Sequence, residues 1–211
     1  MFFYQMKEER FICLYGGNDE AWIRKFRNSA KDVASKAQIN WGMVYVGKKN
    51  AKKRLEEISS SITKTESSHI VIDATKMWFF WARLERMLYW KLQHGMSVEK
   101  DNIMREMMTL LSFDGSDQGW AIFWRGKTQE TARAKGTAAI DCMEKFHEWQ
   151  DDALRNGFIQ ALNNYLQKID TGKHCNRLIL AGVNGAIPGT VQCADCGRDM
   201  EMFFMYHCCP E

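Results

Sequence analysis

The sequence predicts an α/β fold in which a central, mostly parallel sheet is flanked by helices and followed by a small Cys-rich appendage. Short apolar runs alternate along the chain with segments of helical periodicity, which is typical of a sheet covered by helices. The first strand, helix and second strand fit into about 37 residues, a length that suits a crossover between parallel strands. Five of the seven cysteines lie within the last 37 residues, which distinguishes the tail from the rest of the chain.

The N-terminal part of the chain predicts a strand, a helix and a second strand. Residues 11–15 form an apolar run that ends at Gly16-Gly17, which indicates a buried strand followed by a tight turn. Asn18 or Asp19 can cap the helix that follows. Residues 39–46 read as the second strand. The apolar face of the intervening helix holds Trp22, Phe26, Val33 and Ala37.

The remaining elements continue the alternation of helices and strands. Helical patterns cover residues 48–61, 77–93, 101–111, 128–154 and 158–169, and strand patterns cover 120–124, 177–180 and two short pieces around 196–198. A thioredoxin-like and a flavodoxin-like arrangement both fit this order. We expect an α/β domain over residues 1–172 and a Cys-rich tail over 173–211.

Charge and hydropathy exclude several classes of protein. The formal net charge is +3, from 29 basic and 26 acidic residues, which is too small to indicate nucleic-acid binding. No segment is long and apolar enough for membrane insertion, and the first residues lack the pattern of a signal peptide. We therefore expect a cytoplasmic protein.

The tail carries the strongest local signal, a candidate structural zinc site. Cys193 and Cys196 have CxxC spacing and are followed by Gly197, as in a zinc knuckle. A site has at most four ligands, and adjacent strand residues point to opposite faces, so only one of a neighbouring cysteine pair is expected to face the ion. Disulfides and reduced, buried thiols remain open alternatives. The further candidate ligands are Cys208, Cys209, His207, Cys175 and His174.

No catalytic centre is predicted. A dithiol oxidoreductase places its CxxC motif after a strand and at the start of a helix, where the helix N-terminus lowers the thiol pKa. The corresponding turn here, residues 16–20, holds no cysteine. The alternatives kept beside a structural role are a thioredoxin-like oxidoreductase using Cys193 and Cys196, and a zinc-stabilised adaptor.

The helix predicted from Met77 is apolar on most sides, which indicates that it is deeply buried or covered by a partner. Core packing is the simpler interpretation. A contact between protomers is the sharper one, because aromatic and Arg residues dominate interface hot spots. The candidate interface residues are Trp78, Trp81, Arg83 and Trp90.

Several segments together resemble the C-terminal region of the sieve element occlusion proteins of plants. They occur in the order of that family and span nearly the whole chain. One departure is His207, at a position where the family pattern has Arg. The segments are Ile12–Phe26, Val44–Lys48, Trp78–Glu85, Leu110–Asp114 with Ser116–Trp120, His174–Leu180, Cys193–Glu201 and Tyr206–Cys209.

The resemblance implies a structural protein of phloem sieve elements. Members of that family form filaments and, in legumes, calcium-responsive forisomes, and they are thought to plug sieve tubes after wounding. The implied partners are the chain itself and other sieve element occlusion proteins. The acidic loop at residues 114–117 does not match a calcium-binding EF-hand loop, so the sequence itself predicts no calcium site.

Overall fold

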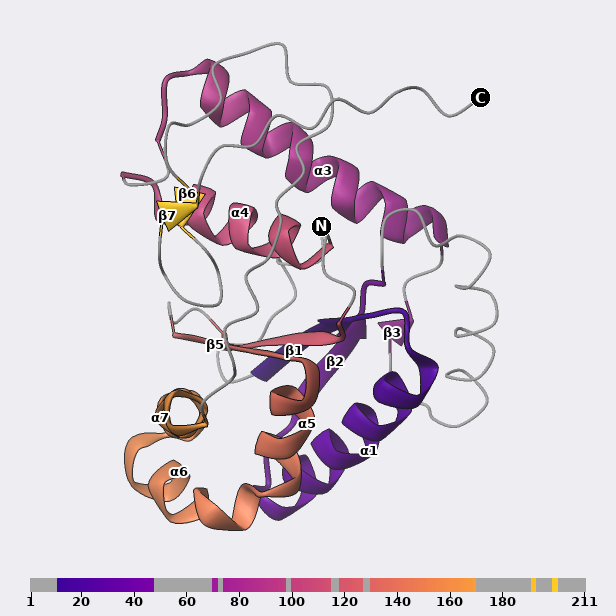
Figure 1. Ribbon diagram of the computed structural model, residues 1–211, viewed down its shortest axis with the longest axis vertical. Helices are drawn as coiled ribbons and strands as arrows, with labels where there is room; N and C mark the ends of the chain where they lie inside the picture. Colours follow the sequence, from indigo (N-terminus) through magenta and orange to yellow (C-terminus); the bar gives the residue numbers. More distant parts are fainter. Residues whose placement is uncertain are drawn as a thin grey trace. The chain divides into compact units, whose positions relative to one another are not determined.

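The computed structural model describes residues 11–47, 70–71, 74–97, 100–114, 118–126, 130–169, 191–192 and 199–200 (Figure 1). Its strands are β1 (Phe11–Gly16), β2 (Trp41–Tyr45), β3 (Ile70–Val71), β4 (Trp120–Arg125), β5 (Thr131–Lys135), β6 (Val191–Gln192) and β7 (Asp199–Met200). Its helices are α1 (Glu20–Lys36), α3 (Ala74–Gln93), α4 (Asn102–Asp114), α5 (Gly136–Glu144), the 3-10 turn η2 (Phe146–Glu148), α6 (Gln150–Asn156) and α7 (Phe158–Lys168).

The chain divides into two compact units. The first comprises residues 1–78 and 117–171, and the second comprises residues 79–116 and 172–211. This division groups most of α3 and all of α4 with the tail, and the predicted domains, residues 1–172 and 173–211, stay a prediction.

The first unit contains a sheet of five strands in the order β3-β2-β1-β4-β5. β1, β2 and β3 are parallel, with Leu14 beside Val44, as the predicted strand–helix–strand unit requires. β4 and β5 run antiparallel to their neighbours, with Leu14 also beside Ile122. The α/β class is thus confirmed, but the prediction of a mostly parallel sheet is wrong, because the chain returns through β4 and β5 in a hairpin.

The predicted long helix over residues 128–154 is also wrong, because its first part is strand β5. Thr131, Arg133 and Lys135 alternate with two buried alanines, which is the two-residue period of a half-buried strand. Alanine, arginine and lysine are good helix formers, so their intrinsic propensity favours the wrong state. Gly136 then adopts a φ of 54°, and α5 begins there.

Helices α1, α5 and α7 cover one face of the sheet and form an aromatic core with it (Figure 1). Tyr15 of β1 contacts the ring of Phe26 on α1, with ring centroids 5.5 Å apart. Phe158 of α7 packs edge-on against Trp41 of β2, with centroids 5.5 Å apart. Side chains on the opposite face, such as Leu14 and Ile122, are buried as well. Burial on both faces explains why these strands appear in the sequence as continuous apolar runs.

Helix α1 begins and ends as its sequence predicts. The carboxylate of Asp19 accepts a hydrogen bond from the backbone N–H of Ala21 at 2.9 Å and so caps the helix. Trp22, Phe26 and Val33 lie on the buried face, which confirms the predicted apolar stripe.

The second unit contains α4, all but the first turn of α3, and a two-stranded antiparallel pair formed by β6 and β7. The pair brackets residues 193–198, in agreement with the short strands expected there. The predicted helix at 48–61 and the predicted strand at 177–180 lie outside the described residues. None of the helices that the structure describes is long and apolar enough to cross a membrane.

Candidate interaction surface and the closed end of the sheet

The carboxyl end of β1 is the place where an α/β sheet would normally hold a ligand. Here the first residues beyond the strand, Gly16 and Gly17, are packed against other parts of the same unit. A Cβ added to Gly16 would lie 2.8 Å from the indole ring of Trp120, and one added to Gly17 would lie 2.8 Å from the Cα of Gly119. Real Cβ atoms essentially never make contacts this short, so both positions require glycine.

Trp22 fills the same end of the sheet from α1. Its indole N–H donates a hydrogen bond to the backbone carbonyl of Gly136 at 2.7 Å. Its ring stacks on Phe26, with centroids 5.0 Å apart and an interplanar angle of 8°. A Cβ on Gly119 would lie 2.1 Å from the indole, so the missing side chain of Gly119 makes the space that Trp22 occupies.

Two further hydrogen bonds complete this arrangement, which we call the Trp22 interlock (Trp22, Gly119, Gly136, Gly17 and Tyr45). The N–H of Gly136 donates to the carbonyl of Gly119 at 2.7 Å, and the Tyr45 hydroxyl donates to the carbonyl of Gly17 at 2.9 Å. Burial raises the pKa of Tyr45 to about 12, so this hydroxyl keeps its proton. The turn after β1, which holds Gly17, therefore packs against the residue before β4, Gly119.

Cys13 and Cys142 lie in the core of the first unit, and both are free thiols. Burial raises the pKa of the Cys13 thiol well above its usual value, and the neighbouring Cys142 adds to the shift. Burial also raises the pKa of Cys142. Because the thiolate is the reactive form, neither cysteine is an activated nucleophile.

The seven predicted zinc ligands, Cys193, Cys196, Cys208, Cys209, His207, Cys175 and His174, all lie outside the described residues. Within the described ranges, no three His, Cys, Asp or Glu side chains come together as a metal site. The zinc site stays a prediction.

Helix α3 has one buried face and one exposed face. Met77, Trp81 and Leu88 recur at helical spacing and are buried. Trp81, one of the four predicted interface residues, has no exposed surface at all. Trp81 is therefore a core residue, and a substitution there would be expected to destabilise the fold, so it is unsuitable as a test of association.

The other predicted interface residues of α3 are exposed: Trp78, Arg83 and Trp90. Phe79 and Met87 are exposed too, although the sequence prediction did not single them out. We define the α3 outer face as Phe79, Arg83, Arg86, Met87 and Trp90. At 100° per residue these five side chains fall on one side of the helix, opposite Trp81. A helical-wheel count from the buried residues would have identified Phe79 and Met87.

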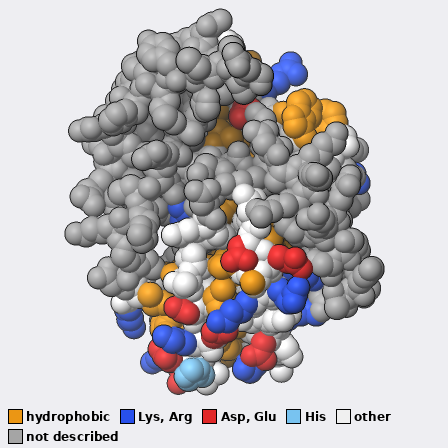
Figure 2. Space-filling view, turned by 45° about the vertical axis from the view of Figure 1, so that its right-hand side comes forward, with side chains coloured by type: hydrophobic (Ala, Val, Ile, Leu, Met, Phe, Trp, Pro, Cys, Tyr) orange, Lys and Arg blue, Asp and Glu red, His pale blue; other side chains and the backbone are white. Residues whose placement is uncertain are grey.

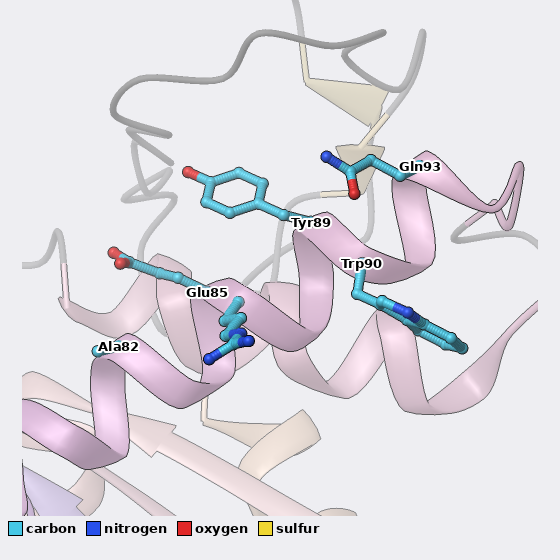
Figure 3. A pocket seen from close by; sticks show the side chains of 6 residues that line it. Ala82, Glu85, Tyr89, Trp90 and Gln93 are labelled. Carbon is cyan, nitrogen blue, oxygen red and sulfur yellow. The ribbon is translucent and has the colours of Figure 1, made fainter.

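A shallow groove of about 400 Å³ runs along the edge of the α3 outer face (Figure 3). Figure 3 shows Glu85 and Tyr89 on one flank and Trp90 on the other. Burial and the charge of Glu85 raise the pKa of Tyr89. The described residues that line the groove all belong to α3: Ala82, Glu85, Arg86, Tyr89, Trp90 and Gln93. The described part of the groove is thus an open surface made by successive turns of one helix, and such a surface can contact another macromolecule.

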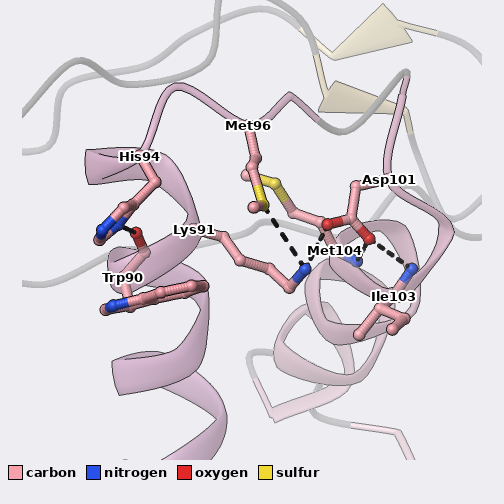
Figure 4. Close-up of polar contacts among 7 residues, drawn as sticks. All are labelled: Trp90, Lys91, His94, Met96, Asp101, Ile103 and Met104. Carbon is pink, nitrogen blue, oxygen red and sulfur yellow. Dashed lines mark hydrogen bonds and ion pairs between the residues drawn. The ribbon is translucent and has the colours of Figure 1, made fainter.

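The end of α3 is tied to the start of α4 (Figure 4). Asp101 accepts hydrogen bonds from the backbone N–H groups of Ile103 at 2.9 Å and Met104 at 3.1 Å, and it also pairs with the ammonium of Lys91. The bond from Lys91, helped by those from the backbone, lowers the pKa of Asp101. Next to this junction, the ring of His94 lies 4.2 Å from that of Trp90 and covers part of it.

Charges of both signs are mixed on the face of the first unit that Figure 2 shows. Figure 2 shows acidic and basic side chains interspersed there, with no broad field of one sign. This pattern agrees with the net charge of +3 and does not resemble a nucleic-acid interface. Among the large apolar residues, Leu154 on α6 is the most exposed of those described, at 85%.

Comparisons with known proteins define the class of this protein. The family model for the sieve element occlusion C-terminus matches residues 1–210. The chain therefore belongs to the sieve element occlusion family, as the resemblance of its sequence segments implied.

Individual relatives come from Arabidopsis thaliana. The chain is 35% identical to protein SIEVE ELEMENT OCCLUSION A over 98% of its length and 26% of that protein. It is 33% identical to protein SIEVE ELEMENT OCCLUSION B, over 97% of the chain and 28% of that protein. Protein SIEVE ELEMENT OCCLUSION C is 26% identical over 94% of the chain and 28% of that protein. The chain thus spans about a quarter of the length of these curated relatives. No solved structure matches it.

Proposed function

We propose that this chain is a structural module of plant phloem that packs with copies of itself and with other sieve element occlusion proteins in the cytoplasm of sieve elements. In this role it contributes to the filaments that occlude sieve tubes after wounding, and it is not an enzyme. The names of its relatives support the connection to sieve element occlusion. Because the chain matches only about a quarter of the length of those proteins, we assign it a contribution to an assembly and not the whole role of a relative.

The observation that carries the proposal is the Trp22 interlock. Ligand sites of α/β folds lie beyond the carboxyl ends of the strands. At β1 this space is taken up by Trp22, which is hydrogen-bonded to Gly136 and stacked on Phe26. Because this end of the sheet is filled by packing, it favours a role in which the protein binds other proteins through its surface over a role in which it binds a small ligand beyond β1.

The fold supports a thioredoxin-like arrangement over a flavodoxin-like one. A flavodoxin-like sheet has five parallel strands, whereas β4 and β5 here are antiparallel to their neighbours. The oxidoreductase alternative needs a cysteine at the turn between β1 and α1, where the chain has Gly17, Asn18 and Asp19.

For the tail, we keep the proposal of one structural zinc ion held by Cys193, Cys196 and two of the other candidates. Its support is the CxxC spacing together with the short β6–β7 pair that brackets residues 193–198. Elemental analysis of the purified protein, combined with a thiol count under denaturing conditions, tests it. About one zinc per chain with free thiols supports the site, and two disulfides without metal refute it.

The function itself is tested by assembly. The purified 211-residue chain is studied by sedimentation velocity over a concentration series and by negative-stain electron microscopy, alone and mixed with a longer family member. We expect concentration-dependent self-association and incorporation into the filaments of the longer protein. A chain that stays monomeric and does not join those filaments would refute the structural role. Dithiothreitol-dependent insulin reduction that is lost in Cys193→Ser would instead support the oxidoreductase.

A further inference from the structure

We propose that the α3 outer face of one copy binds a patch on helix α6 of the next copy, so that copies associate head to tail. We define the α6 patch as Glu148, Asp151 and Leu154. This inference rests on the proposed structural function and specifies the surfaces through which it acts. The partner is therefore a second copy of this chain.

The α3 outer face has the composition of a protein-binding surface. Phe79, Met87 and Trp90 are 59%, 41% and 53% exposed. Arg83 and Arg86 lie among them, and no ion pair to either arginine is found among the described residues. Tryptophan and arginine are the residues most enriched at interface hot spots.

No carboxylate interrupts the α3 outer face. Glu85 is the acidic residue of α3, and it lies about 100° around the helix from Arg86, on the far flank of the groove. The face therefore carries two positive charges between apolar side chains, and it should select a partner that offers an apolar centre next to acidic groups.

The α6 patch offers these features. Asp151 and Leu154 are three residues apart on α6, so their side chains emerge from the same side of the helix. Leu154 is 85% exposed. Glu148 precedes the helix and is exposed, with its carboxylate accepting a hydrogen bond from Tyr165 at 2.8 Å. Arg155 donates a hydrogen bond to the backbone carbonyl of Asp151 at 3.2 Å, and within the described ranges it forms no ion pair with the carboxylates of the patch.

Two unlike patches on one chain determine the kind of assembly. When patch and partner patch differ, contact between identical copies is heterologous, and it continues indefinitely unless a ring closes. The small net charge of +3 adds little repulsion between copies. An open-ended contact of this kind is what a filament requires.

The size of the α3 outer face indicates a weak individual contact. From their exposed fractions, its three apolar side chains present roughly 300 Å². A stable isolated interface buries about 800 Å² on each partner. The single contact should therefore be strongly concentration dependent, and an assembly should need several such contacts in series or additional ones around them.

The test uses two pairs of charge-matched variants in sedimentation velocity. Arg86→Glu alters the α3 outer face, and Lys100→Glu makes the same charge change at an exposed residue outside it. Asp151→Lys alters the α6 patch, and Glu130→Lys is its control, also exposed. We expect Arg86→Glu and Asp151→Lys each to weaken the association constant roughly tenfold or more, as for loss of one close charge pair. The controls should match the wild type, and circular dichroism verifies that every variant is folded.

Mixing the variants gives the sharpest result. Arg86→Glu retains an intact α6 patch, and Asp151→Lys retains an intact α3 outer face. Their mixture should therefore associate more strongly than either variant alone, because intact contacts alternate with contacts in which the two reversed charges face each other. The combined Arg86→Glu/Asp151→Lys chain should recover part of the association, because the swapped charges again attract.

The possible failures are distinguishable. A wild-type chain that stays monomeric at every concentration overturns self-association and the contact together. A wild type that associates while Arg86→Glu and Asp151→Lys behave like their controls overturns only the contact and leaves the structural function standing. Unchanged self-association of Arg86→Glu combined with loss of binding to phosphatidylserine vesicles would assign the α3 outer face to a lipid surface and also overturn the proposal.

Discussion

Replacing Gly119 by alanine tests whether the glycines around β1 and β4 serve packing. The added Cβ would lie 2.1, 2.3 and 2.4 Å from three atoms of the Trp22 indole. No backbone strain contributes, because Gly119 is not among the residues with positive φ. The indole has to move, although it is stacked on Phe26 and hydrogen-bonded to Gly136.

The expected cost has two parts. Overpacking a well-filled interior costs about 1–3 kcal/mol, and loss of the hydrogen bond from Trp22 to Gly136 costs about 1 kcal/mol. We therefore expect the free energy of unfolding to fall by about 2–4 kcal/mol. For a chain of this size the melting temperature should drop by roughly 4–16 °C. Urea unfolding, followed by tryptophan fluorescence and circular dichroism, measures the change.

Two comparisons identify the cause. Gly42→Ala is the matched control, because a Cβ at Gly42 has no atom within 4 Å, and its effect should be neutral or stabilising by up to about 1 kcal/mol. In a Trp22→Leu background, Gly119→Ala should lower the free energy of unfolding much less, because the indole that the added Cβ would clash with is absent. An equal cost in both backgrounds, or no cost in the wild type, would refute the interlock.

Three further predictions follow from the ionisable groups. Cys13 and Cys142 should resist iodoacetamide at pH 8 in the native protein and react in denaturant, because burial raises the pKa of both thiols; peptide mapping that finds native Cys13 labelled would contradict their burial. Tyr45→Phe should destabilise the fold by about 1 kcal/mol, through loss of the hydrogen bond to Gly17. The wild-type protein should lose stability as pH rises from 10.0 to about 12, because the raised folded-state pKa of Tyr45 stabilises the fold only while the hydroxyl stays protonated. Tyr45→Phe should lose less stability over that range. If the free energy of unfolding of Tyr45→Phe falls with pH as steeply as that of the wild type, Tyr45 is not the group responsible. Lys91→Met should lose less stability than the wild type as pH falls below 3.8, because Lys91 lowers the folded-state pKa of Asp101 and the resulting stabilisation is lost when the carboxylate is protonated. Lys100→Met is the control. If both variants lose stability equally at low pH, the Lys91–Asp101 ion pair does not stabilise the fold.

Local sequence patterns predicted the elements whose propensity and environment agree. β1 follows from a continuous apolar run that ends at two glycines, and α1 follows from Asp19 together with the recurrence of Trp22 and Phe26. β5 was missed because its alternating alanines and charged residues have helix propensity, whereas pairing with β4 holds them in a strand. Pairing between strands distant in sequence overrides local preference, and a single sequence does not display it.

The candidate surface was predicted in part. The sequence showed that α3 is rich in aromatic residues, but it did not show which of them are buried. Trp81 turns toward the core and Trp90 remains exposed, and this difference depends on the neighbours of each position in three dimensions. The α6 patch was not anticipated, because one leucine near a glutamate and an aspartate, on and just before a short helix, has no distinctive sequence pattern.

The sequence by itself determined the family, the α/β class and the first strand–helix–strand unit, because these depend on residue order and local periodicity. The tertiary structure decided that the sheet is mixed, that Gly119 and Gly136 enclose Trp22, and which side of α3 is exposed. Each of these results depends on contacts between segments far apart in the chain. Their energies come from packing and strand pairing, which local sequence preferences do not contain.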